Sequence, residues 1–194
     1  MKSTKADRRS QRTRQLLEGA LVALLIEKPY DSIAVQDIID RANVGRSTFY
    51  AHYRDKEDLL ASSFGRVLDG MGQHLDLSHD GSSAIFPTLE LFRHVQEHYH
   101  LYTALLWGRG IDVLFKVGQQ SMSQIVERRI AALVADGPPP GVPLPILSNY
   151  LSGTLATLLK WWLDNKMPYP PERMDEVFQQ LIMPGVWAVL RKPV

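Results

Sequence analysis

The chain of 194 residues has no cysteine, almost no net charge and no long apolar run. Without cysteine it has no disulfide framework, no thiolate zinc site and no thiol nucleophile. No stretch approaches the ~18 uninterrupted apolar residues of a transmembrane helix, so none is expected. A chain of this length buries about 70% of its unfolded surface and folds without a disulfide or a metal. The composition, 45% apolar and 22% charged, is that of an ordinary globular protein.

The net charge of +1 argues against a nucleic-acid partner only if the charges are evenly spread. Residues 1–56 carry eleven Lys and Arg against seven Asp and Glu, a difference of +4, whereas the rest of the chain has a difference of −3. The excess is strongest in the first fourteen residues, where six basic residues face Asp7 alone. A basic arm of this kind suits a phosphate backbone, because each neutralised phosphate releases condensed counterions. A solvated terminus has the same composition.

A basic start followed by an apolar run is also the outline of a secretory signal. Glu18 and Glu27 bracket the run Leu16–Ile26, and no small-residue cleavage site follows it. The apolar residues recur at helical spacing, which favours an amphipathic helix over a signal peptide. We therefore expect a soluble, cytoplasmic protein.

The apolar periodicity predicts an all-α fold without a convincing alternating strand. Helices are predicted at about 8–27, 35–42, 46–53, from 56 onward, and near 84–107, 109–135, 145–165 and 172–191. Pro29 ends the first helix, Asp31 or Ser32 starts the second, and Asp55 is a good N-cap for the fourth. Polar loops are expected at 78–83 and at 137–145, where five of nine residues are proline.

Two short helices joined by the turn Asn43-Val44-Gly45 are typical of a helix-turn-helix. The second helix of such a motif lies in the major groove and presents its N-terminal residues, here Arg46-Ser47-Thr48, to base edges. Arg pairs bidentately with guanine, and Ser or Thr serves bases or phosphates. Phe49 and Tyr53 are expected to pack inward. A generic helical hairpin with an exposed Arg and Ser is the plainer alternative.

Residues from about 12 to 60 resemble the DNA-binding domain of the tetracycline-repressor (TetR) family. The matching stretch is Tyr30-Asp31, Val35-Gln36-Asp37-Ile38, Arg41-Ala42, Val44, Thr48-Phe49-Tyr50, Tyr53 and Lys56-Glu57-Asp58-Leu59-Leu60. The resemblance implies a helix-turn-helix spanning Ala34 to Tyr53. The residues expected to contact DNA are Arg12, Gln36, Arg46, Ser47, Thr48, Tyr50, His52 and Lys56. Ala34 and Gly45 depart from the family pattern, because a capping Ser or Thr is usual at both positions.

The same resemblance implies three parts: a basic arm over residues 1–11, the DNA-binding domain over 12–70, and a helical effector-binding and dimerisation domain over 71–194. The last two helices of the family pair with their copies in a dimer. The apolar residues expected in that interface are Leu151, Leu155, Leu158, Trp162, Val177, Leu181 and Trp187. The alternative is that both apolar stripes are buried inside one chain.

Aromatic residues are frequent between residues 86 and 120. Core packing explains each of them singly. An effector pocket lined by aromatic and a few polar groups is the more specific hypothesis. The residues expected to line it are His98, Tyr102, Trp107, Phe115 and Trp161.

The string His94-Val95-Gln96-Glu97-His98 matches the H-x-x-E-H pattern of a zinc hydrolase. On a helix the two histidines share a face, as a zinc pair requires. A catalytic zinc also needs a third protein ligand and an open cleft. A metal-dependent hydrolase using His94, Glu97 and His98 is therefore kept only as a remote alternative, and no enzyme activity, metal or cofactor is expected.

The sequence predicts a dimeric transcriptional regulator, specifically a repressor released from a palindromic double-stranded DNA operator by an unknown small-molecule effector. A regulator without a small-molecule gate, controlled by a protein partner, is the alternative. Neither the operator nor the effector is named by the sequence.

Overall fold

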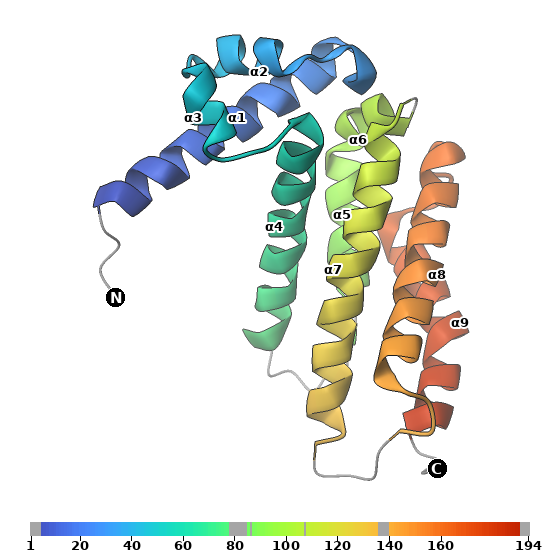
Figure 1. Cartoon of the computed structure of the whole chain (residues 1–194). Coiled ribbons are helices and arrows are strands. Elements are labelled where there is room, and N and C mark those ends of the chain that lie inside the picture. The colour runs from blue at the N-terminus through green and yellow to red at the C-terminus, as the bar shows by residue number, and fades with distance from the viewer. Residues whose placement is uncertain (1–4, 78–84, 86, 107, 136–139, 191–194) are drawn as a thin grey trace. The chain divides into compact units, whose positions relative to one another are not determined.

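In a computed structural model of the chain, the residues described are 5–77, 85, 87–106, 108–135 and 140–190. Within these ranges the regular elements are nine α-helices and one short 3-10 helix, η1, which confirms the all-α prediction (Figure 1). They are α1 (Lys5–Glu27), η1 (Tyr30–Ser32), α2 (Val35–Ala42), α3 (Arg46–Tyr50), α4 (Lys56–Leu77), α5 (Thr88–Glu97), α6 (Tyr99–Leu106), α7 (Gly110–Leu133), α8 (Leu144–Asp164) and α9 (Pro171–Leu190). None of these helices has the length and apolar character needed to cross a membrane.

The helices form two compact units, which we call the N-terminal and C-terminal units. The N-terminal unit holds the chain up to Phe64 together with Tyr99–Leu114, so it includes α6. The C-terminal unit holds Gly65–His98 and the chain from Phe115 onward. The sequence does not anticipate that α6 packs with the N-terminal unit. The functional division at residue 70 stays a prediction.

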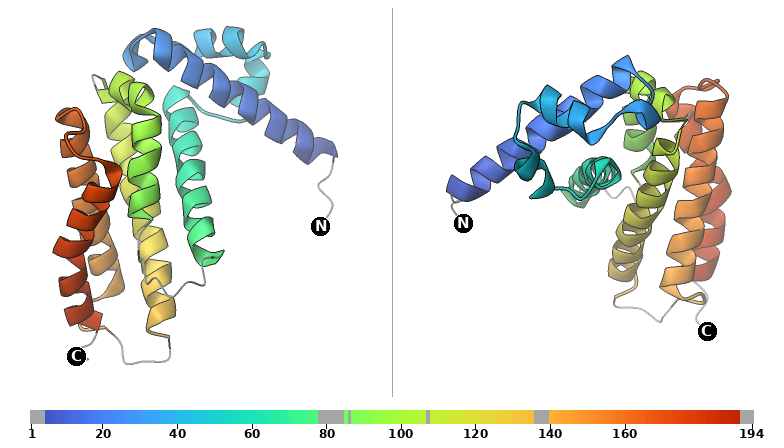
Figure 2. Two further views of the ribbon diagram at one scale, coloured as in Figure 1. Left: turned by 180° about the vertical axis from the view of Figure 1, so that it is seen from behind. Right: turned by 45° about the horizontal axis from the view of Figure 1, so that its top comes forward.

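In the N-terminal unit, α2 and α3 lie beside α1 in every view (Figures 1 and 2). One face of α1 is buried, and apolar residues from the other helices complete the core. The core residues are Leu17, Leu21, Leu24, Leu25, Tyr30, Ile33, Ile38, Ile39, Phe49, Tyr53, Leu59, Leu60, Tyr102, Leu105, Ile111 and Leu114. This core fixes the two short helices of the helix-turn-helix to a long one, because helices this short gain most of their stability from tertiary packing.

In the C-terminal unit, α5, α8 and α9 run side by side with the main part of α7 (Figures 1 and 2). Their buried apolar residues form one core, which includes Leu91, Phe92, Val95, Met122, Ile125, Val126, Ile130, Leu151, Leu155, Trp162, Met174, Phe178 and Val186. Side-chain hydrogen bonds join α5 to α9. The Thr88 hydroxyl donates to the Asp175 carboxylate, and Gln179 Nε2 donates to Thr88 Oγ1 at 3.1 Å.

Two predicted boundaries differ from the structure. α1 begins at Lys5, so most of the predicted arm over residues 1–11 is helical rather than a separate tail. The predicted helix near 84–107 is divided at His98 into α5 and α6. The predicted loop at 78–83 lies outside the described residues, as do residues 137–139 of the proline-rich loop.

Candidate nucleic-acid interface

The turn between α2 and α3 has the predicted geometry. Asn43 adopts the left-handed conformation, with φ 50° and ψ 51°, which Asn tolerates better than most residues. Its N–H donates to the Asp40 carbonyl at 3.2 Å, and the Val44 N–H donates to the Ile39 carbonyl at 3.2 Å. The Gly45 carbonyl then accepts the first N–H groups of α3. These local bonds stop α2 and start α3 within three residues, as a helix-turn-helix requires.

The start of α2 lacks a capping side chain at Ala34, and Asp37 replaces it. The Asp37 carboxylate accepts the Ala34 N–H at 2.8 Å and the Lys28 ammonium at 2.6 Å. The hydrogen bond from Lys28, followed by that from the Ala34 N–H, lowers the pKa of Asp37. The prediction that Asp31 or Ser32 starts this helix is wrong, because both lie in η1. The Lys28–Asp37 pair ties α2 to the end of α1.

Phe49 and Tyr53 pack inward, as predicted. Phe49 is fully buried, and the Tyr53 hydroxyl donates to Glu18 Oε1 on α1 at 3.2 Å. This anchoring leaves the opposite side of α3 open to solvent. Arg46, Ser47 and Tyr50 are exposed there and Thr48 is half-buried, so three of the predicted DNA contacts are presented outward.

Arg46 is held in place by two other predicted DNA contacts. Its Nη1 donates to Gln36 Oε1 at 3.3 Å, and its guanidinium carbon lies 5.6 Å from the centroid of the Tyr50 ring. Gln36 is oriented in turn by Asp40, which accepts its Nε2 at 2.8 Å. Both groups that touch Arg46 are uncharged, so these contacts leave its positive charge available to a guanine or a phosphate.

An open cleft of about 620 Å³ lies between α1 and α3. Its lining residues are Arg9, Ser10, Thr13, Ser47, Thr48, Ala51 and His52. Three of the predicted DNA contacts therefore share the cleft with three residues of α1 that the sequence analysis did not select. Arg12, which it did select, is exposed and is not part of this lining. The sequence does place Arg9 and Thr13 on one face of the predicted helix, because they are one helical turn apart.

Lys56 points into the fold. Its ammonium donates to the carbonyls of Ile33 at 2.8 Å and Tyr30 at 3.0 Å, and lies 4.6 Å from the centroid of the Tyr30 ring. The ammonium therefore holds η1 against the start of α4. A contact between Lys56 and a DNA phosphate stays a prediction.

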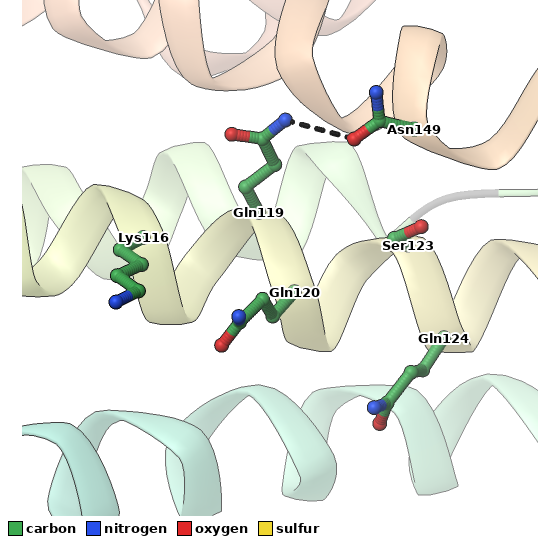
Figure 3. A pocket seen from close by; sticks show the side chains of 6 residues that line it. All are labelled: Lys116, Gln119, Gln120, Ser123, Gln124 and Asn149. Carbon is green, nitrogen blue, oxygen red and sulfur yellow. Dashed lines mark hydrogen bonds between the residues drawn. The ribbon is translucent and has the colours of Figure 1, made fainter. Parts of the chain in front are cut away.

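The C-terminal unit carries a polar groove of about 600 Å³ along α7 and α8. It is lined by Lys116, Gln119, Gln120, Ser123, Gln124 and Asn149. Gln119 points toward α8 and donates to Asn149 Oδ1 at 3.1 Å, whereas Gln120 and Gln124 point to the other side of α7 (Figure 3). The side chains diverge across the ridge of one helix, so the groove is an open polar surface rather than an enclosed site.

None of the four predicted effector-pocket residues that the structure describes lines this groove. Tyr102 is buried in the N-terminal unit, with its ring centroid 6.3 Å from that of Phe64, and burial raises the pKa of its phenol. His98 and Trp161 are exposed, and Phe115 is half-buried. Trp107 lies outside the described residues. Tyr102 packs in a core and Trp161 is exposed, and the aromatic effector pocket stays a prediction.

Several predicted dimer residues are already buried inside the single chain. Leu151, Leu155 and Trp162 are at most 2% exposed. Trp162 packs edge-on against Phe92, and its Nε1 donates to the Tyr169 carbonyl at 2.8 Å. These three side chains have no surface left for a partner, so the alternative of burial within one chain holds for them.

The remaining predicted dimer residues lie nearer the surface. Leu158, Val177 and Trp187 are half-buried, and Leu181 is 72% exposed. The sequence analysis missed a row of exposed apolar residues at helical spacing on α8, namely Ile146, Tyr150 and Trp161. This row lies on the side of α8 away from the buried leucines.

The His94 and His98 rings are 4.3 Å apart between centroids, and His98 Nδ1 bonds to the His94 carbonyl at 2.9 Å. Burial is the largest cause that lowers the pKa of His94 to about 4. Across the described residues, no group of three or more His, Cys, Asp or Glu could hold a metal ion. The pair alone does not meet the three-ligand requirement of a catalytic zinc.

Comparisons with known proteins agree with this geometry. Residues 16–62 match the model of bacterial regulatory proteins of the tetR family, and residues 87–184 match that of a transcriptional regulator C-terminal region. An uncharacterised HTH-type transcriptional regulator, YxbF of Bacillus subtilis (strain 168), is 26% identical over 186 residues. That alignment covers 93% of this chain and 47% of the relative, so the chain spans about half the relative's length.

Solved structures share the fold. A TetR transcriptional regulator from Streptococcus agalactiae 2603V is 25% identical, with a TM-score of 0.63 and coverage of 91% of this chain and 97% of that one. RolR in complex with its ligand resorcinol is 18% identical, with a TM-score of 0.61 and coverage of 96% and 97%. With a helix-turn-helix that presents Arg46 outward and two family models that together match most of its length, the chain belongs to the tetR family of bacterial transcriptional regulators.

Proposed function

We propose that the protein is a repressor that binds a palindromic DNA operator as a homodimer in the cytoplasm. The observation that carries this proposal is the outward Arg46 at the N-terminal end of α3, held by Gln36 and Tyr50. In a helix-turn-helix these residues meet base edges in the major groove, while surrounding contacts to phosphates set register and affinity.

The proposed dimer uses the exposed apolar row of α8 and Leu181 of α9. Tyr150 is 63% exposed on α8, and Leu181 is 72% exposed on α9. Tyr150 belongs to the row of Ile146, Tyr150 and Trp161 on one side of α8, and exposed apolar residues gathered on one side favour an interface more than a single one does. A dimer also supplies the two half-sites, about 34–36 Å apart, that a symmetric helix-turn-helix reader needs.

Leu181→Asp tests the interface, and Ile26→Asp is its matched control. Ile26 lies on α1 and is 70% exposed, so the same charge is placed on an equally open apolar residue elsewhere. We expect Leu181→Asp to sediment as a monomer and to lose operator affinity, whereas Ile26→Asp stays dimeric. A dimeric Leu181→Asp protein rules out this interface.

We propose that a small effector binds one dimer conformation better than the other and so opposes operator binding. A fold neighbour is known with resorcinol bound, which supports a small-molecule gate. A regulator gated by a protein partner remains the alternative. The family is one of transcriptional regulators, and the metal-dependent hydrolase has no support.

Selection of bound duplexes from a random DNA pool, with and without candidate metabolites, tests the proposal. We expect a two-fold symmetric consensus, with half-site centres about one helical turn apart. A metabolite that reduces the recovery of duplexes with this consensus is identified as the effector. Recovery of unrelated duplexes at all salt concentrations rules out sequence-specific binding.

A further inference from the structure

The cleft between α1 and α3 has the chemistry of an anion site. Its polar lining side chains are one guanidinium, one imidazole and four hydroxyls, supplied by Arg9, His52, Ser10, Thr13, Ser47 and Thr48. Among the lining residues that the structure describes, none carries a carboxylate. Guanidinium and hydroxyl donors are the groups that proteins commonly direct at the phosphate oxygens of DNA.

The α1 side of the cleft has a defined position because α1 is helical there. Arg9 and Thr13 are one turn apart, and the Thr13 hydroxyl donates to the Arg9 carbonyl at 3.1 Å. One turn further, Leu17 is fully buried in the core of the N-terminal unit. The face of α1 that enters the core thus continues into the face that lines the cleft.

The α3 side of the cleft adjoins the residues expected to read bases. Ser47 and Thr48 line the cleft and directly follow Arg46 in α3. His52 lies at the other end of the same short stretch. A DNA strand whose bases meet Arg46 therefore has its backbone close to this cleft.

We infer that the cleft holds one phosphate of the DNA backbone, with Arg9 supplying the charge and Ser10 and Ser47 supplying hydrogen-bond donors. This inference rests on the proposed DNA binding and adds α1 as a second contacting element. It gives the predicted basic arm over residues 1–11 a fixed helical contact through Arg9.

The test compares Arg9→Ala with Arg8→Ala on duplex DNA. The two variants have the same net charge and both residues are exposed, but at 100° per residue Arg8 lies on the side of α1 away from the cleft. In the proposed dimer Arg9→Ala removes one phosphate contact from each protomer. Losing two contacts reduces the slope of log K against log salt by about 1.8, which corresponds to about sixtyfold in affinity at 0.1 M salt. We expect this loss for Arg9→Ala on operator and random duplexes alike, and a much smaller loss for Arg8→Ala. Equal losses for the two variants overturn the inference.

A single neutral methylphosphonate placed at each phosphate of the selected operator in turn locates the contact. We expect one position in each half-site at which the wild-type protein loses affinity and Arg9→Ala loses nothing further. A scan in which the two proteins respond alike at every position overturns the inference. Circular dichroism checks that both arginine variants fold.

Two further outcomes separate the possible failures. If the wild-type protein binds no duplex, the proposed function itself fails. If inorganic phosphate at constant ionic strength binds the wild-type protein but not Arg9→Ala, and leaves the DNA affinity of the wild-type protein unchanged, the cleft takes free phosphate compounds and the backbone assignment is overturned.

Discussion

Gly110 begins α7 at a point where alanine has no room. A Cβ there would lie 2.5 Å from Leu105 Cδ2 and 3.0 Å from the Tyr30 ring. Leu105 is 1% exposed and Tyr30 is fully buried, so neither side chain can move into solvent. Overpacking of this kind costs about 1–3 kcal/mol, and alanine regains at most about 1 kcal/mol of helix propensity. We expect Gly110→Ala to lower the free energy of unfolding by about 1–2 kcal/mol.

Gly108→Ala is the matched control, two residues earlier in the same turn. Its Cβ would lie 2.9 Å from Asp31 Oδ2, the far end of an exposed side chain that can rotate away. The cost is then the bond from the Arg109 N–H to that carboxylate, 3.2 Å long and open to water, which is worth less than about 1 kcal/mol. Urea unfolding followed by circular dichroism measures both variants. A Gly110→Ala protein as stable as the wild type, or less affected than Gly108→Ala, refutes this reasoning.

Three further predictions concern stability, all read by urea unfolding. Burial lowers the pKa of His94 to about 4. As the pH falls from about 6.5 to 4, the unfolded chain takes up a proton that the folded chain does not. The free energy of unfolding therefore falls across that window and levels off below it. His94→Gln is expected to lose this step, and an unchanged pH profile would contradict it. Trp162→Ala is expected to lower the free energy of unfolding by about 3–5 kcal/mol. Trp161 is 45% exposed, so Trp161→Ala is expected to lower it by less than half as much. Similar losses would contradict the assigned faces of α8. Lys56→Met is expected to cost about 1–3 kcal/mol, because it leaves the half-buried carbonyls of Tyr30 and its neighbours without their donor; a neutral effect would mean that water replaces the ammonium.

The features that could be predicted from the sequence are those decided within a few residues. The left-handed Asn43 and the capping Asp55 depend only on local backbone chemistry, and both have the expected geometry. The inward Phe49 and outward Arg46 follow from helical periodicity on a short helix with one apolar side. The family resemblance added the DNA-contact positions, which periodicity does not supply.

The features that could not be predicted depend on distant contacts. α8 is apolar on more than one side, so its sequence does not say that Leu151 is buried and that Tyr150 next to it is 63% exposed. α6 follows α5 in the chain but packs with the N-terminal unit. The local apolar pattern does not indicate with which unit a helix packs. The predicted first helix includes Arg9, but only the folded unit places this face of α1 beside Ser47 and His52.

The central claim is that α3 reads DNA sequence through Arg46. The most direct test measures the dissociation constants of the wild-type protein and Arg46→Ala on the selected operator and on random duplex DNA, at one salt concentration. We expect a loss of about 1–3 kcal/mol on the operator, or roughly 5- to 160-fold, with little change on random DNA. Equal weakening on both duplexes would make Arg46 a phosphate contact and would contradict the account.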